Sequence, residues 1–366
     1  MVEAKARILS TNERKYWDEN IQNFKYSHPL NDFGWGEVRT VDGWKNIYIA
    51  AEREGQFCGG LMLLIKKIQF TPFTIFYSPR GPVWDFEAKD VLKALVEKVK
   101  NIAREERSIF LRVDPSIPEA DMKKERDILK TVGFSHLTQR WTFWNAPADV
   151  SRIDLTKFEN IDEYHGLLHR DTRRCIRKAS KEGVSIEKGK EIEELKTFYG
   201  IFKEFSYQKG FMSRGWEYQK KLWEELVSKN YGRLFLAKYQ GEIIGGLICI
   251  LFASRCLAMH MGTPYKYQKL QSSYAYVWES IKWAKERDCI WYSFRGVGTT
   301  PSQEFFKKKF KPEVIKLTGY YDLPFRKISY KIFYLCEFVV LPSAWKFLMA
   351  IRRFFHKLKK KIEIKQ

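Results

Sequence analysis

The sequence predicts an α/β protein with α+β mixed sheets, built from two tandem domains of one fold. Three landmarks recur in the same order along the 366 residues. They are a hairpin with Gly59-Gly60 that returns at Gly245-Gly246, a strand at Ile109 that returns at Ile290, and Leu129-Lys130 that returns at Phe306-Lys307. The offset between the copies falls from 186 to 181 to 177 positions, which indicates small deletions between two copies of one unit.

Each expected element has its own signal. Strand-forming residues broken by turns predict hairpins at 46–65 in the first copy and at 234–250 in the second. Apolar residues at helical spacing predict helices at 14–27 and 87–107. Residues 33–39 are rich in glycine and aromatic side chains, and we expect a loop there.

The domain boundaries follow from the repeat. We place the first domain at residues 1–152, completed by residues 320–342, and the second domain at 153–320. Residues 343–366 form a tail in which apolar and basic residues alternate as in a basic amphipathic helix. Such a helix is suited to an anionic membrane surface. The alternative is a C-terminal helix that packs on the second domain.

The charge balance and the cysteines narrow the class of protein. The formal net charge is +21, from 65 Lys and Arg against 44 Asp and Glu, which favours a polyanionic partner such as nucleic acid, an anionic membrane or a phosphorylated substrate. The six cysteines form no Cys-x-x-Cys pair, so we expect no metal site and a reducing cytosol. The N-terminus has no apolar core of a signal peptide, and no run of about 18 apolar residues predicts a membrane span. We expect a cytoplasmic monomer.

The order of the elements resembles the acyltransferase fold of the N-acetyltransferases, so each domain is expected to be GNAT-like. In that fold the pyrophosphate of acyl-coenzyme A rests on a glycine-rich loop at the start of the long helix. Here residues 267–274 and 85–89 occupy that place, and neither segment is glycine-rich. We therefore expect coenzyme A not to be the donor.

Several motifs together resemble the Fem family, the tRNA-dependent aminoacyltransferases that build peptidoglycan interpeptide bridges. The motifs are Trp35-Gly36 before a basic residue, Tyr-Ser-Pro-Arg-Gly-Pro-Val at 77–83, Arg-Val-Asp-Pro at 112–115, the basic helix at 172–179, Phe306-Lys307 with Phe310, and Tyr-Asp-Leu-Pro at 321–324. Two departures stand out. The family's Tyr-Asp-Phe-Gly-Gly is Tyr-Ser-Phe-Arg-Gly at 292–296, and no coiled-coil arm is expected in the second domain.

The resemblance implies a reaction and its catalytic residues. An amine of a peptidoglycan precursor, lipid II or a nucleotide-linked muropeptide, attacks the ester of aminoacyl-tRNA, with no cofactor besides the tRNA co-substrate. Lys307 would stabilise the oxyanion, positioned by Phe306, and an ordinary pKa of about 10.4 would keep it protonated. Asp114 is a candidate base. The alternatives are that Asp114 caps the turn before Pro115 and that residues 307–309 are a solvated basic face.

The resemblance also implies binding residues. The precursor would be bound by Trp35, Tyr292 and arginines for its diphosphate, namely Arg39, Arg173 and Arg174. The tRNA phosphates would be bound by Lys178, Lys308, Lys309 and Lys311. The alternative for Arg173 and Arg174 is that their helix is a solvated amphipathic helix without a binding role.

Three other functions remain open at this point. They are an aminoacyl-tRNA transferase that acts on a phospholipid, a coenzyme A-dependent acyltransferase of surface-polysaccharide synthesis, and a basic membrane scaffold without catalysis.

Overall fold

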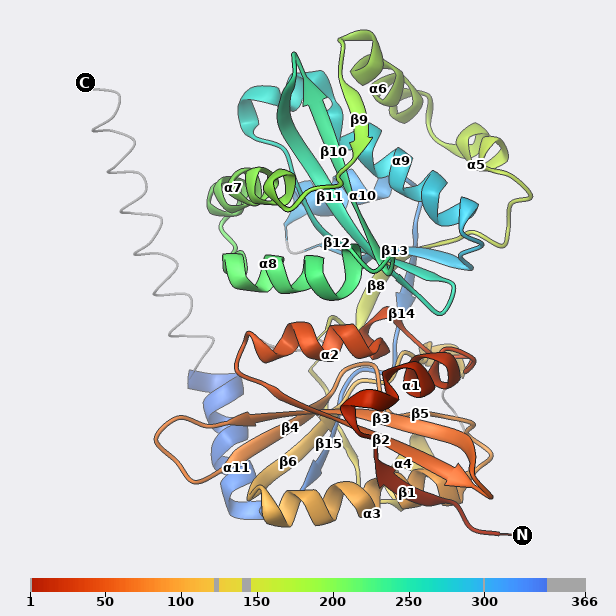
Figure 1. The fold of residues 1–366 in the computed structure, drawn as a ribbon, viewed down its shortest axis with the longest axis vertical. Helices are drawn as coiled ribbons and strands as arrows, with labels where there is room; N and C mark the ends of the chain where they lie inside the picture. Colours follow the sequence, from red (N-terminus) through yellow and green to blue (C-terminus); the bar gives the residue numbers. More distant parts are fainter. Residues whose placement is uncertain (1, 122–124, 140–145, 299, 341–366) are drawn as a thin grey trace.

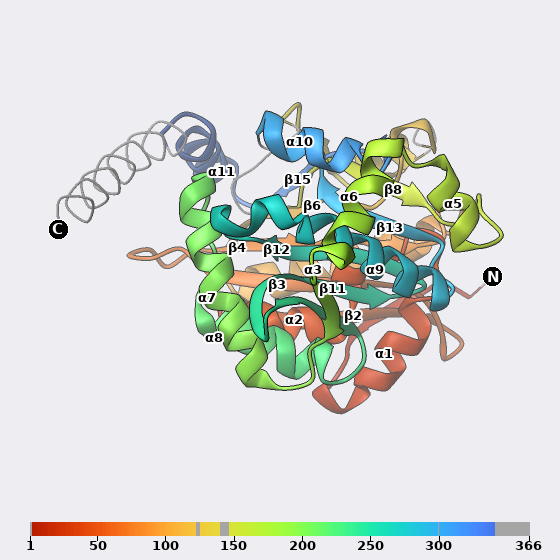
Figure 2. The same ribbon diagram turned by 90° about the horizontal axis from the view of Figure 1, so that it is seen from above.

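The computed structural model describes residues 2–121, 125–139, 146–298 and 300–340. Two α/β domains lie one above the other along the long axis of the molecule (Figure 1). Each has one mixed sheet with helices on both faces, and Figure 2 shows the same layers from above. The predicted basic tail, residues 343–366, lies outside the described residues.

The first sheet has the order β1-β2-β3-β4-β6-β15-β7, and β5 pairs with β3. Its strands are β1 (Lys5–Ile8), β2 (Lys45–Arg53), β3 (Gln56–Lys67), β4 (Thr74–Ser78), β5 (Val83–Trp84), β6 (Ser108–Val113), β7 (Ser135–His136) and β15 (Tyr321–Pro324). The helices are α1 (Arg14–Ile21), α2 (Phe33–Thr40), α3 (Lys89–Glu105), α4 (Glu125–Thr131) and α11 (Lys327–Leu335). Helix α3 crosses between the parallel strands β4 and β6, and its buried residues Val91, Leu95 and Val99 cover one face of the sheet.

The second sheet repeats this plan with the order β14-β8-β13-β12-β11-β10-β9. Its strands are β8 (Asp149–Asp154), β9 (Ser185–Lys188), β10 (Gly232–Tyr239), β11 (Glu242–Phe252), β12 (Arg255–Gly262), β13 (Trp291–Gly296) and β14 (Glu313–Lys316). The helices are α5 (Ile161–Leu167), α6 (Arg170–Lys181), α7 (Ile192–Lys209), α8 (Trp216–Leu222), α9 (Ser272–Glu286) and α10 (Pro301–Lys308). Within the described part of this domain α7 and α8 pack against the sheet and each other, and no coiled-coil arm is present.

The domain boundary differs from the expected one by a few residues. Strand β8 belongs to the second sheet from Asp149 onwards, so the predicted boundary at 152 falls inside a strand. The partners of β8 are β13 and β14, which lie far along the chain, and a local pattern does not reveal them. Strand β15 returns to the first sheet and pairs with β6 and β7.

The segment expected as a loop at 33–39 is the helix α2, which corrects that prediction. The Asp32 side chain caps it by accepting a hydrogen bond from the Trp35 amide. Its glycines are needed for close packing, because a Cβ at Gly34 would lie 2.9 Å from the Glu225 carbonyl oxygen and one at Gly36 would lie 2.0 Å from the Tyr48 hydroxyl.

Helix α2 joins the two domains. It packs on α8 and on the short π-helical segment Trp223–Val227 of the second domain. One cluster of buried apolar side chains runs through both domains. Arg14 adds an ion pair to Glu225 at 2.8 Å. The domains therefore share a core, and the space between them is set by packing.

The C-terminal part of the described chain is tied to the first domain by buried charges. Arg112 on β6 donates to Asp322 on β15 at 2.7 and 2.8 Å and to Glu337 after α11 at 2.7 and 2.9 Å. All three side chains are buried. The two carboxylates offset the free-energy cost of burying the guanidinium. Without them, an unpaired charge at this position would destabilise the fold.

Candidate active site

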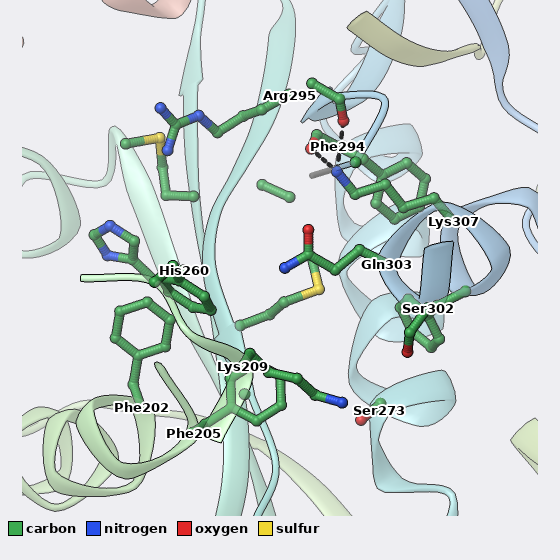
Figure 3. Close-up of a pocket in the computed structure, with 18 of the residues that line it drawn as sticks. Phe202, Phe205, Lys209, His260, Ser273, Phe294, Arg295, Ser302, Gln303 and Lys307 are labelled. Atoms are coloured by element: carbon green, nitrogen blue, oxygen red, sulfur yellow. Dashed lines mark hydrogen bonds between the residues drawn. The ribbon is translucent and has the colours of Figure 1, made fainter. Parts of the chain in front are cut away.

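A pocket of about 1050 Å³ opens in the second domain where two parallel strands separate. Strands β12 and β13 pair only between Arg255–Leu257 and Trp291–Ser293. Beyond that point residues 258–263 line one wall and residues 294–298 line the other. Aromatic and methionine side chains of α7 and β12 make the floor apolar, as Figure 3 shows for Phe202 and Phe205. Such a pocket excludes water and strengthens the charges in it.

Helix α10 holds Lys307 at the edge of this pocket. Thr300 caps the helix by accepting from the Gln303 amide, and Pro301 starts it. Phe306 and Phe310 pack into the core of the second domain as predicted, with Phe310 fully buried. Figure 3 shows the Lys307 side chain turned back toward the strand that carries Phe294.

The ammonium group of Lys307 is fixed by two backbone carbonyls. Its Nζ donates to the oxygen of Phe294 at 3.1 Å and to that of Gly296 at 2.5 Å. An ammonium has three N–H donors, so one remains for a group in the pocket. Lys307 is therefore an oriented donor and not part of a solvated basic face.

The expectation of an ordinary lysine pKa was wrong. Burial, together with the smaller effect of the positive charge of Arg295, lowers the pKa of Lys307 to about 8. At neutral pH the group is still mostly protonated, but it loses its proton close to physiological pH.

Sequence reasoning missed several polar groups that line the pocket. They include Asp149, Lys209, Arg214, His260, Gln303 and Lys316, together with Arg295, which had been noted only as a departure. The Nδ1–H of His260 donates to Oε1 of Gln219 at 3.0 Å, and burial lowers the pKa of His260 to about 3, so it is neutral and a weak base. These residues lie in different elements of the second domain, and no local motif links them.

A second group of charges lies between the domains, beside the pocket. Arg39 on α2 is buried, stacks on Trp44 and lies 3.6 Å from Asp42. Arg214, which lines the pocket, reaches the same carboxylate at 3.0 Å from the second domain. Arg39 Nε has no hydrogen-bond partner within the described residues. Two guanidinium groups thus share one carboxylate, and the positive excess suits a phosphate.

Two residues predicted to bind the substrate are placed in the core instead. Trp35 is buried and packs edge-on against Tyr218, so it joins the domains. Tyr292 is fully buried, with its hydroxyl 2.9 Å from that of Ser280, and does not line the pocket. These placements correct the expectation that both side chains contact the substrate.

Asp114 is also a structural residue. Its carboxylate accepts from the Tyr77 hydroxyl at 2.9 Å and from the Arg80 amide at 2.7 Å. Burial raises its pKa to about 6. Both oxygens are used, the group is 1% exposed, and it is not among the residues that line the pocket. It anchors the loop at residues 78–82 and is not placed to act as a base there.

The predicted basic residues of α6 and α10 lie on the outside of the second domain. Thr172 donates to the Lys309 carbonyl, which joins the first turn of α6 to the end of α10. Arg173 bonds the Gly166 carbonyl, and Arg174 pairs with Asp171 while 74% exposed. Figure 1 shows α6 far from α2, which carries Arg39. The three arginines therefore do not form one phosphate site, which corrects that prediction.

The remaining cations share this outer surface. Lys178 and Lys311 are exposed, Lys308 pairs with Glu304 at 2.7 Å, and Lys309 lies over the Phe305 ring.

Comparison with known protein families gives one decisive match. Residues 12–239 and 232–337 match the FemAB family. This chain belongs to the FemAB family. The resemblance to the Fem family is thereby confirmed. The lipid II:glycine glycyltransferase of Staphylococcus aureus is 30% identical over 220 residues, which are 59% of this chain and 52% of that protein. The FemAB chain thus spans about half the length of the curated relatives it matches.

Solved structures confirm the fold. The crystal structure of FemX superposes with a TM-score of 0.81 at 19% identity, covering 90% of this FemAB chain and 99% of FemX. A tandem GNAT protein from the clavulanic acid biosynthesis pathway superposes with a TM-score of 0.53 at 10% identity, covering 88% and 98% of the two chains. The prediction of two tandem GNAT-like domains is therefore confirmed.

Proposed function

We propose that this FemAB-family chain transfers an amino acid from aminoacyl-tRNA to an amine of a peptidoglycan precursor. The observation that carries the proposal is the oriented ammonium of Lys307, with two N–H groups bound to backbone carbonyls and a third available at an apolar pocket. The lipid II:glycine glycyltransferase relative supports lipid II as the acceptor class.

The chemistry is aminolysis of an ester. The acceptor amine attacks the carbonyl carbon, a C–N bond forms, and the ester C–O bond breaks with the electron pair leaving on the ribose oxygen. The proton lost by the amine goes to that oxygen, and a neighbouring ribose hydroxyl is a suitable carrier. Lys307 stabilises the negative charge on the carbonyl oxygen in between. A fixed donor of this kind lowers a barrier by about 3 kcal/mol.

The diphosphate of the acceptor, whether lipid-linked or nucleotide-linked, is assigned to Arg39 and Arg214. Both point at Asp42 from opposite domains, and Arg214 also borders the pocket. Arg39 keeps its predicted role, whereas Arg214 takes the place of Arg173 and Arg174. A precursor bound in this way extends from the domain junction toward Lys307.

The tRNA is assigned to the outer surface formed by α6 and α10. Its cations lie on α6 and at the end of α10, the helix that carries Lys307, with Arg173 and Lys309 half-buried and the others exposed. Backbone phosphates bound there would lie near the ester. These cations are Arg173, Arg174, Lys178, Lys308, Lys309 and Lys311. Contacts of this kind neutralise phosphates without reading sequence, and they weaken with salt.

An anionic membrane surface is the proposed partner of α11. Ile328, Ile332 and Leu335 recur at helical spacing and are 79%, 60% and 58% exposed. Lys327 and Lys331 flank this stripe and have no acidic partner within the described residues. The opposite side of α11 packs on the first domain. None of the described helices combines the length and the apolar composition that a membrane span needs. We therefore propose peripheral binding at the inner face of the plasma membrane.

The test uses the full chain with a pool of charged tRNAs. Lipid II, nucleotide-linked muropeptide and phosphatidylglycerol are offered as separate acceptors, and the products are weighed by mass spectrometry. A mass increase of one or more amino acids on a muropeptide supports the proposal. Transfer to phosphatidylglycerol alone would identify the phospholipid enzyme, and no transfer to any acceptor would leave the proposal without support.

A parallel test addresses the membrane. Vesicles with and without anionic lipid are floated with the wild type and with an Ile332→Asp variant. Binding to anionic vesicles that the variant loses supports the role of α11, whereas equal flotation of both proteins contradicts it.

A further inference from the structure

Arg295 lies at a β-bulge that turns its side chain into the pocket. Ser293 pairs with Arg152 and Gly296 pairs with Val150, so β13 has one residue more than β8 between these pairs. Such bulges re-aim side chains. Arg295 has φ +62°, a left-handed conformation that favours glycine over residues with a Cβ. The Fem pattern described above has a glycine here, so this chain accepts an unfavourable backbone conformation and gains a guanidinium group.

Within the described residues, the guanidinium of Arg295 contacts no acidic side chain. No hydrogen bond or ion pair of its side chain is present within the described residues. Burial lowers the pKa of Arg295, interaction with Tyr218 opposes this, and the positive charges of Arg214, Arg80 and Arg39 lower the pKa as well. Asp42 already serves Arg39 and Arg214, and Asp149, which also lines the pocket, forms no ion pair with Arg295 within the described residues. The surroundings of Arg295 therefore carry an excess of positive charge.

The position of Arg295 separates it from the two charged centres already assigned. Lys307 is assigned to the reacting ester, and its ammonium bonds the carbonyls of Phe294 and Gly296 on either side of Arg295, so the two residues are close. Arg39 and Arg214 serve the diphosphate at the domain junction. Figure 3 shows the Arg295 side chain extending from the Phe294 wall toward the strand that carries His260. It thus crosses the space that a peptide must occupy between the diphosphate and its accepting amine.

We propose that Arg295 binds a carboxylate on the peptide stem of the acceptor and makes the enzyme selective for stems that carry it. This inference rests on the proposed function. A guanidinium matches a carboxylate through two parallel hydrogen bonds, and the apolar floor from Phe202, Phe205 and Met261 strengthens that pair by excluding water. The carboxylate can come from three places. It can be the C-terminal carboxylate of the stem, the side chain of an acidic residue within the stem, or a carboxylate on the carbon that bears the accepting amine.

The experiment uses soluble muropeptides that differ at one carboxylate each. They are compared in three pairs. The first pair has a C-terminal carboxylate or amide, the second has its internal acidic residue free or amidated, and the third has meso-diaminopimelate or lysine as the accepting residue. Wild type is compared with Arg295→Gly, which relieves the backbone strain and should fold, and with Arg295→Lys, which keeps the charge. Transfer gives KM and kcat, and calorimetry with Lys307→Met gives binding without turnover.

The expected result is that one carboxylate change raises the KM of the wild type about 10-fold or more. Arg295→Gly should then treat both acceptors of that pair alike, with Arg295→Lys in between. Equal selectivity of wild type and Arg295→Gly in every pair overturns the inference, and so does an equal loss with all acceptors, which would assign Arg295 to the diphosphate. Selective binding without any transfer keeps the inference and removes the proposed reaction. Absence of both binding and transfer removes both.

Discussion

Replacement of Lys307 by methionine should lower turnover and yet stabilise the fold. The ammonium is buried and its pKa is lowered from 10.5 to about 8. Each pKa unit corresponds to about 1.4 kcal/mol, so keeping the proton in the folded state costs about 3 kcal/mol at pH 7. The two bonds to the carbonyls of Phe294 and Gly296 return about 1 kcal/mol each. The net gain for Lys307→Met is therefore on the order of 1 kcal/mol.

The loss of activity is larger than this gain. Removal of an oxyanion donor should lower kcat by about 10²-fold or more. Transfer to muropeptide gives kcat, and urea unfolding gives the stability. The sign of the stability difference is checked by pH. The cost of the charge is present below pH 8 and vanishes as the pH rises toward 10.5, whereas the two hydrogen bonds remain, so the wild type should become the more stable protein there. Lys93→Met, on the exposed side of α3, is the matched control and should change neither quantity.

Two results would refute this reasoning. One is a Lys307→Met protein that retains turnover within about threefold, which would remove the donor role. The other is a loss of stability comparable to the loss of turnover, which would make Lys307 a structural residue.

Three further predictions concern pH, substrate binding and stability. The kcat of transfer should fall as the pH rises through about 8, because Lys307 then loses its proton, and Arg295→Gly should move this fall to higher pH. Arg214→Ala should raise KM several-fold for diphosphate-bearing acceptors and leave kcat nearly unchanged, as steady-state kinetics would show. Asp322→Asn should lower the free energy of unfolding by about 3–5 kcal/mol, because Arg112 loses a buried partner, and urea unfolding measures this.

Each of these has an outcome that would contradict it. A kcat that rises through pH 8 would mean that neutral Lys307 acts as a base. An equal effect of Arg214→Ala on an acceptor without diphosphate would assign Arg214 elsewhere. Unchanged stability of Asp322→Asn would mean that Glu337 alone compensates Arg112.

The duplicated fold could be predicted from the sequence because its signals are local. Each Gly-Gly hairpin, and likewise the Phe306-Lys307-Phe310 motif, spans only a short stretch of sequence. The structure confirms the pairing of the hairpins and the packing of the two phenylalanines. Helix α2 was missed because its glycines look like turn residues until their neighbours, Tyr48 and Glu225, are in place. Propensity alone cannot supply that tertiary information.

The site was harder to predict for the same reason. Arg39 and Arg214 share Asp42 only because of the way the two domains meet. The shifted pKa of Lys307 depends on its burial beside Arg295. Tyr292 was expected at the substrate although its hydroxyl faces Ser280 on α9. The direction of a side chain in a strand next to a bulge follows only from the sheet register.

The return of β15 to the first sheet imposes an order on the growing chain. At the ribosome, the second sheet needs only residues 149–316, whereas the first stays open until residues 321–324 have emerged. Arg112 has no partner in Glu337 until that residue, 225 positions later, has been synthesised. At a synthesis rate of about 5–20 residues per second, that delay lasts roughly 10–45 seconds. The N-terminal half is thus made first and finished last, and during translation its unpaired β6 edge is the segment most in need of a chaperone.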